Sequence, residues 1–171
     1  APAKTVDYDA YAEQLFERIE SGLRYLESRD VNRLMLIGIG SGAYWSSRYA
    51  SEAGDRWRLN LTLIDARPPE GEIEPLLNPL VAKLKIPTLD LYHGSGLNRS
   101  QLEAQARSRL NEVRRKARKN YTQRRLPLNP AIADRSYKRL LSTFRGLFEK
   151  RIKKAQSQEM AGSPPETAPG Q

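Results

Sequence analysis

The sequence predicts an α/β fold, a three-layer sandwich built on a mostly parallel sheet of about four strands. Two observations lead to this prediction. Short apolar runs alternate with longer segments of helical periodicity along most of the 171 residues, an order typical of a parallel sheet covered by helices on both faces. In addition, residues 33–45 pass from an apolar run through a glycine cluster directly into a helix-compatible segment.

The first three predicted elements are a helix, a buried strand and a second helix. From Asp7 to Arg29, apolar residues recur at spacings of three and four, which places them on one face of an amphipathic helix. Arg33–Ile37 is a short apolar run bounded by glycines, as expected of a buried parallel strand. Helical spacing then runs from Ser41 to about Gly54, where the glycine predicts a helix end.

The middle of the chain predicts two more strands around a crossover helix. Leu59–Ile64 is the second strand, and Ile73–Leu84 is a short helix whose start is interrupted by prolines. Ile86–Tyr92 is the third strand, with Pro87 near its beginning, where a missing backbone N–H matters least.

The C-terminal part predicts a charged helix, an edge strand, a last helix and a tail. The charged helix spans Arg99 to Asn120 and the edge strand Tyr121–Leu126. After a loop at 128–133, Asp134 is the expected N-cap of a helix whose apolar face reaches Ile152. Residues 156–171 are rich in Ser, Pro, Gly and Glu, so we expect one domain over 1–155 and a disordered tail over 156–171.

Charge divides the chain into unlike halves. The formal net charge is +9, but residues 1–97 hold 11 Lys and Arg against 14 Asp and Glu, whereas residues 98–171 hold 18 against 6. The absence of cysteine rules out disulfides and thiolate metal sites. The basic half therefore predicts an anionic partner.

The glycine cluster fits two kinds of site. Gly38 to Ala43 matches the pattern G-x-G-x-x-A of a dinucleotide-binding turn, and Asp65 ends the next strand, where an acid can bind a ribose hydroxyl. The rest of the chain is short for a second, substrate-binding unit, which counts against this interpretation. It stays open as an alternative function that uses Gly38, Gly40 and Ala43.

The same cluster also has the strand–turn–helix order of a hydrolase nucleophile elbow, G-x-S-x-G. With Gly38 and Gly42 at the two small positions, the nucleophile position falls on Gly40, which has no side chain. Ser41 follows one residue later, and moving the frame to it would put the branched Ile39 at a strained small position. We therefore expect Ser41 to cap the following helix or to donate an early helical N–H.

Four segments carry a family resemblance: Asp7–Leu26, Leu36–Ala43, Leu63–Pro68 and Ile86–Tyr92. Residues 5 to about 150 resemble an uncharacterised bacterial family of α/β-hydrolase-like envelope proteins, described as a domain of unknown function. The resemblance covers the C-terminal half of that family's fold. It implies a periplasmic or envelope setting, early strands upstream of Ala1, and a missing half or partner chain that completes the sheet.

A serine hydrolase also needs a base and an orienting acid. In the hydrolase pattern the acid position falls on Leu97, and the terminal loop where the base is expected, residues 128–134, holds no histidine. Ser41, His93 and Asp65 remain weak catalytic candidates. We therefore predict a non-catalytic, hydrolase-derived protein, with a divergent serine esterase that uses Ser41 and His93 as the alternative.

The basic region is the predicted binding surface. Nine cations fall within nineteen residues, opposed by Glu112 alone: Arg107, Arg109, Arg114, Arg115, Lys116, Arg118, Lys119, Arg124 and Arg125. The simpler interpretation is a solvated helix whose long side chains cover the sheet. As an anion-binding surface, made of Arg114, Arg115, Lys116, Arg118, Lys119, Arg124 and Arg125, it fits a membrane surface or anionic polymer better than nucleic acid, because only Tyr121 is near for stacking.

The sequence predicts no metal and no cofactor. It contains one histidine and no cysteine. The alternating Glu70, Glu72 and Glu74 are typical of a solvated loop rather than of a metal site.

Overall fold

The computed structural model describes residues 7–31, 34–93 and 99–126, together with Ser142 and Gly146. The chain divides into two compact units, residues 1–127 and 128–171. The helices and strands whose bounds are given below belong to the first unit. Among the residues described, no helix is long and apolar enough to cross a membrane.

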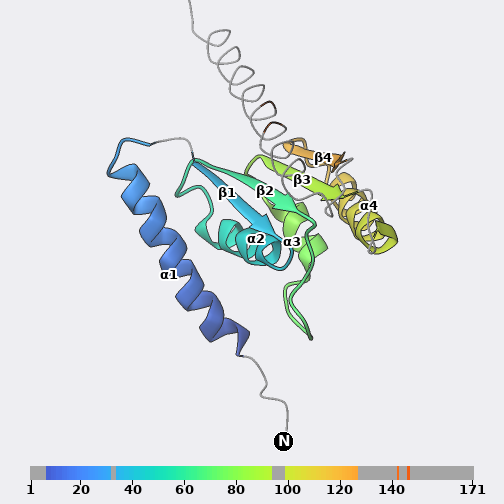
Figure 1. Cartoon of the computed structure of the whole chain (residues 1–171), viewed down its shortest axis with the longest axis horizontal. Helices are drawn as coiled ribbons and strands as arrows, with labels where there is room; N and C mark the ends of the chain where they lie inside the picture. Colours follow the sequence, from blue (N-terminus) through green and yellow to red (C-terminus); the bar gives the residue numbers. More distant parts are fainter. Residues whose placement is uncertain (1–6, 32–33, 94–98, 127–141, 143–145, 147–171) are drawn as a thin grey trace, which may run out of the picture. The chain divides into compact units, whose positions relative to one another are not determined.

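The first unit is an α/β fold with an all-parallel sheet, as predicted. Its strands lie in the order β1-β2-β3-β4 (Figure 1), and each is parallel to its neighbour. In chain order the elements are α1 (Tyr8–Glu27), β1 (Leu34–Ile39), α2 (Gly42–Ala53), β2 (Leu59–Ile64), α3 (Leu77–Lys83), β3 (Thr88–His93), α4 (Arg99–Arg115) and β4 (Tyr121–Leu126).

Several predicted boundaries were wrong: α3 begins at Leu77 rather than Ile73, and β3 spans Thr88–His93 rather than Ile86–Tyr92. Two further shifts have clear physical reasons. β1 continues two residues beyond Ile37, because its pairing with β2 stays in register to Ile39 opposite Ile64. α4 ends at Arg115 rather than near Asn120, because Ala117 adopts a left-handed φ of 50°. The N–H of Arg118 then bonds to the carbonyl of Val113, and that of Ala117 to Arg114, a Schellman C-cap that forms here without glycine.

Part of the predicted C-terminal structure lies outside the described residues. Of the last predicted helix, only Ser142 and Gly146 are described, and both are helical. The predicted loop at 128–133, the N-cap Asp134 and the tail at 156–171 all fall outside that part of the chain.

α1 packs on α2 through aromatic rings. The ring of Tyr11 lies 5.0 Å from that of Trp45, and the ring of Phe16 lies 5.4 Å from that of Tyr49 in an edge-on arrangement. At its start, the Asp7 carboxylate accepts hydrogen bonds from the N–H groups of the first turn, as an N-cap should. On the predicted apolar face Leu23 is buried, whereas Tyr11 and Leu26 stay 48% and 39% exposed, so this face packs only in part.

α2, α3 and α4 lie on one face of the sheet, since the strands follow one another in sequence and parallel crossovers are right-handed. On the opposite face, the central residues Thr62, Ile64, Leu89 and Leu91 are also buried, which agrees with a three-layer sandwich. The edge strand β1 differs on that face, because Ile37 is 47% exposed and Ile39 is 64% exposed.

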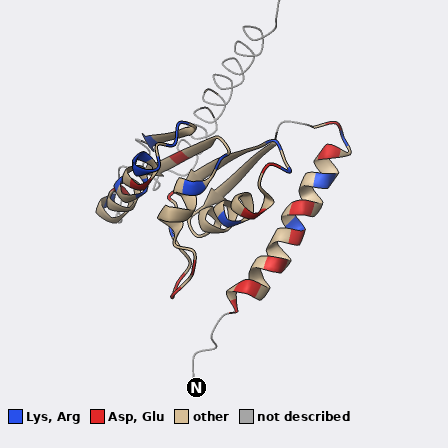
Figure 2. Ribbon diagram, turned by 180° about the vertical axis from the view of Figure 1, so that it is seen from behind, with Lys and Arg blue, Asp and Glu red and all other residues tan. Residues whose placement is uncertain are grey.

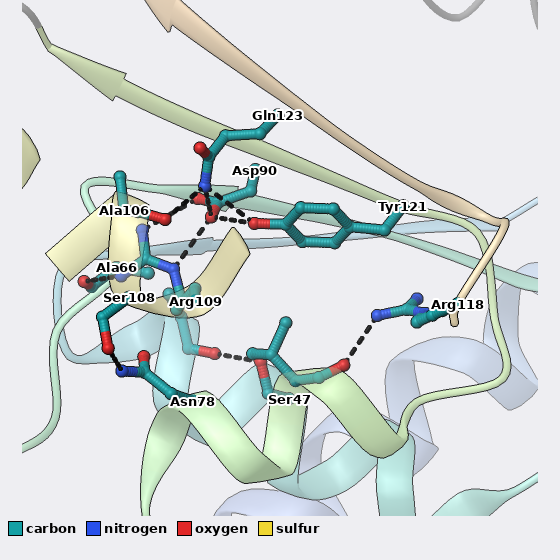
Figure 3. A network of polar contacts seen from close by, with 12 residues as sticks. Ser47, Ala66, Asn78, Asp90, Ala106, Ser108, Arg109, Arg118, Tyr121 and Gln123 are labelled. Atoms are coloured by element: carbon teal, nitrogen blue, oxygen red, sulfur yellow. Dashed lines mark hydrogen bonds and ion pairs between the residues drawn. The ribbon is translucent and has the colours of Figure 1, made fainter. Parts of the chain in front are cut away.

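A buried ion pair joins α4 to β3 (Figure 3). Arg109 is 1% exposed and Asp90 is not exposed at all. Nε and Nη2 of Arg109 donate to the two carboxylate oxygens at 2.8 and 3.0 Å, and Nη1 donates to the carbonyl of Ala66 at 3.0 Å. Arg109, one of the nine cations counted in the basic region, is therefore a core residue neutralised by Asp90 rather than a solvated one.

Two residues of β4 complete this network (Figure 3). The Tyr121 hydroxyl donates to Asp90, and the side-chain amide of Gln123 donates both to Asp90 and to the carbonyl of Ala106. Burial disfavours the charge on Arg109, but the Asp90 carboxylate more than offsets this, so the pKa of Arg109 is raised. Burial and the same carboxylate raise the pKa of Tyr121, which therefore stays protonated as a donor.

We predict that Arg109→Met destabilises the protein by about 3–5 kcal/mol, because it leaves the Asp90 carboxylate buried without its cation. Urea denaturation followed by circular dichroism measures this. Arg107→Met, at an exposed position two residues away on the same helix, is the matched control and should change stability by less than about 0.5 kcal/mol. Equal effects of the two substitutions would contradict the structural role of the pair.

Candidate functional site

The glycine cluster forms a sharp turn between β1 and α2. Gly40 adopts φ 59°, in the left-handed region that favours glycine. Its N–H donates to the carbonyl of Ile64 at 2.9 Å, and its own carbonyl accepts from Ala43 and Arg67, both at 3.2 Å. The apex of the turn is therefore held to the end of the neighbouring strand, at the carboxyl edge of the sheet where α/β proteins bind ligands.

Gly38 lets the helix approach the strand closely. A Cβ at this position would lie 2.5 Å from the Cα of Ala43 and 2.5 Å from the carbonyl oxygen of Gly42, so no side chain fits there without backbone movement. A Cβ at Gly42 would meet no atom within 4 Å. Of these two glycines, only Gly38 is required by packing.

The apex of the turn lacks a nucleophile. Gly40 stands there, and a Cβ built on it would lie 3.4 Å from Nε of Arg67, so an exposed guanidinium borders the place of a nucleophilic side chain. Ser41 comes one residue later at the N-cap of α2. Its backbone carbonyl accepts the first helical N–H groups, but its side chain makes no capping hydrogen bond.

The structure brings two of the three catalytic candidates together. Asp65 directly follows β2, and His93 ends β3. One carboxylate oxygen of Asp65 accepts from the backbone N–H of His93 at 2.8 Å, and the other pairs with Nδ1 of the ring. The side chains of His93 and Asp65 are 16% and 24% exposed, so the pair is oriented by the fold and still reachable from solvent.

The backbone at Asp65 is unusual. Its φ is 48°, a left-handed value that is uncommon outside glycine and costs of the order of 1–3 kcal/mol. The N–H of Asp65 bonds to the carbonyl of Leu91 at 2.9 Å, which holds the residue against β3 in this conformation. Because the Asp65 carboxylate is bound to His93, the ribose contact that a dinucleotide site would require is already occupied.

Apart from the buried Arg109, the cations within residues 107–125 fall into two groups, one partly buried residue and seven exposed ones. Arg118 is partly buried and donates to the carbonyls of Val81 and Ile86. It therefore holds the turn after α4 against α3 and against the segment that precedes β3. Five cations are exposed and form no ion pair with a described residue: Arg107, Arg114, Lys116, Lys119 and Arg124. Arg115 and Arg125 are also exposed but pair with Glu112 and Glu103.

We call these seven exposed residues the basic surface. They lie on α4, on the turn that follows it and on β4, where Figure 2 shows blue stretches of ribbon, whereas the ribbon of α1 carries more red than blue. Within the described ranges, no group of three or more His, Asp or Glu side chains is placed to hold a metal ion.

A family model described as "Protein of unknown function (DUF3530)" matches residues 1–150. The chain belongs to the DUF3530 family. No curated protein and no solved structure was found to match it. The comparison thus agrees with the predicted membership of an uncharacterised domain family.

In this DUF3530 chain, the sequence indicated both Asp65 and His93 as catalytic candidates but did not predict that they pair. The available signal was their position, since each ends one of two adjacent parallel strands. It also missed Arg67, whose exposed guanidinium borders the elbow. The clue there was the short distance in sequence from Asp65.

We predict that Gly38→Ala destabilises the protein by about 1–3 kcal/mol, because the added methyl overlaps the α2 backbone. Gly42→Ala adds the same methyl in open space and should be neutral or stabilising by up to about 1 kcal/mol, since alanine favours the helix. Thermal unfolding of both variants measures the difference. A Gly38→Ala variant as stable as Gly42→Ala would mean that the strand and helix do not approach this closely.

Proposed function

We propose that this protein is a degenerate α/β-hydrolase-like protein of the bacterial envelope that acts by binding an anionic partner through its basic surface. The observation that carries the proposal is the set of five exposed cations without an ion pair to any described residue. Unpaired cations on one stretch of surface attract anionic groups at long range, and this attraction weakens with added salt.

Two of the basic residues stabilise the fold and are therefore not part of the basic surface. Arg109 is neutralised by Asp90, and Arg118 is bound to backbone carbonyls. Neither is available to a partner. The exposed cations lie on α4, in the turn that follows it, and on the adjacent edge strand β4.

The elbow supports the degenerate part of the proposal. The turn has the left-handed apex and the close strand–helix contact expected of a nucleophile elbow, but the apex residue is Gly40. A covalent serine mechanism needs a hydroxyl at that position.

An anionic lipid surface or another anionic polymer fits better than nucleic acid. Sequence-tolerant nucleic-acid binding uses exposed aromatic rings on which bases stack. Tyr121 is the aromatic residue nearest to these cations in the sequence, but its hydroxyl is bound to Asp90 and the Arg118 guanidinium lies 5.6 Å from its ring centre. That ring already serves the core.

A divergent serine esterase is the second candidate function, favoured by the paired Asp65 and His93. It would require Ser41 as nucleophile. A fluorophosphonate probe labels activated serines, so labelling of the wild-type chain that is lost in Ser41→Ala would support this candidate. No labelling would remove it.

We predict that the protein sediments with vesicles containing anionic lipid but not with neutral vesicles. A cation at an anionic membrane surface contributes about 1 kcal/mol, so reversing Lys116 and Lys119 together to Glu should weaken binding at least about 30-fold. The matched control is the double reversal of Arg18 and Arg58, both exposed and outside the basic surface.

Equal losses in the two double variants would show that net charge, rather than this surface, governs binding. Binding to single-stranded DNA that exceeds vesicle binding at physiological salt would replace the lipid partner by nucleic acid.

A further inference from the structure

We propose that Asp65 and His93 form a general-base site that hydrolyses small carboxylic esters with water as the nucleophile. This goes beyond the binding role, because it uses a different edge of the molecule and other residues. It also differs from a serine esterase, since no covalent bond to the protein is formed.

The pairing fixes the role of each nitrogen of the His93 ring. Nδ1 lies against one carboxylate oxygen of Asp65, while the other oxygen holds the backbone N–H of the same histidine at 2.8 Å. With its proton on Nδ1, the neutral ring presents Nε2 as a proton acceptor. No group of a described residue hydrogen-bonds to Nε2, and the side chain is 16% exposed. Asp65 is therefore a positioning residue and His93 the base.

Backbone hydrogen bonds tie this pair to the elbow. Gly40 donates to the carbonyl of Ile64, the residue before Asp65, and Asp65 donates to Leu91, two residues before His93. These backbone hydrogen bonds thus connect the end of β1 to the end of β2, and the end of β2 to the end of β3. The base, its acid and the elbow share the carboxyl edge of the sheet.

The elbow supplies groups that suit a developing negative charge. The backbone N–H groups of Ser41 and Gly42 donate to no backbone carbonyl of the described residues, and they open α2, whose N-terminal end favours anions. The guanidinium of Arg67 borders Gly40 and adds a positive charge there. These donors would stabilise the oxyanion that forms when an ester carbonyl is attacked.

Glycine at the apex decides the nucleophile. Without a side chain at Gly40, the base has no hydroxyl of the protein to activate at that position, so we assign water as the nucleophile. Nε2 of His93 takes a proton from water as the oxygen attacks the ester carbon, and the carbonyl electrons move onto its oxygen. When the tetrahedral intermediate collapses, the alkoxide leaves with the proton from the imidazolium, giving acid and alcohol.

The test is hydrolysis of p-nitrophenyl acetate by the full chain. Removing a general base costs about 10²–10⁴-fold in rate, so His93→Gln should reduce the rate to the buffer background. Ser41→Ala keeps the backbone N–H and removes only the hydroxyl, so a rate well above background in this variant would show that the serine is not the nucleophile. Tyr92→Phe, a half-buried neighbour on β3, is the control for local disturbance, and circular dichroism confirms that each variant is folded.

A second readout does not depend on activity. His93 is the chain's single histidine, so its ¹⁵N ring signals are unambiguous. They should show the Nδ1-protonated tautomer, and Asp65→Asn should shift the ring away from it.

Three outcomes would overturn the proposal: a wild-type rate no greater than that of buffer, a His93→Gln rate equal to wild type, or loss of activity in Ser41→Ala. The binding role is tested separately. His93→Gln should still bind anionic vesicles, and the double reversal of Lys116 and Lys119 should still hydrolyse the ester.

Discussion

The buried ion pair between Arg109 and Asp90 is the interaction on which the rest of the described structure depends. It joins α4 to β3, and the hydrogen bonds of Tyr121 and Gln123 to the same carboxylate bring in β4. The third donor of Arg109 holds the carbonyl of Ala66, directly after Asp65. A charge buried in this way is tolerated only because α4, β4 and the segment after β2 supply partners for it. The same network that secures the core therefore also secures the turn that presents Asp65 to His93.

A second constraint is steric and lies at the opposite edge of the sheet, on β1. The contact of Gly38 with the first turn of α2 sets the angle at which the helix leaves the strand, and Gly40 provides the left-handed residue that the turn requires. The result is a helix whose first N–H groups stand beside an apex without a side chain. The turn thus resembles a nucleophile elbow in its geometry, but its apex residue has no side chain that could act as a nucleophile. A turn of this kind without a nucleophile is compatible both with a binding role and with a reaction in which water is the nucleophile.

The basic region shows how far charge patterning can be read. Nine cations within nineteen residues predicted one surface, yet Arg109 lies in the core and Arg118 latches a turn through backbone carbonyls. Nothing in the local sequence separates these two from Arg114 or Lys116, because the distinction depends on what faces each side chain. Asp90, which decides the fate of Arg109, is nineteen residues away on a different element.

The sequence by itself determined the alternation of helices and strands, the limits of β2 and β4, and the position of Gly40 in the elbow, because these follow from local periodicity, apolar runs and glycine spacing. Only the tertiary structure decided that Asp65 and His93 pair, since that contact needs two strands to lie side by side in one register. It also decided the end of α4, where a left-handed alanine closes the helix without the glycine that would have marked it. Short-range patterns specify elements, whereas a site built from the ends of separate strands exists only once those strands are paired.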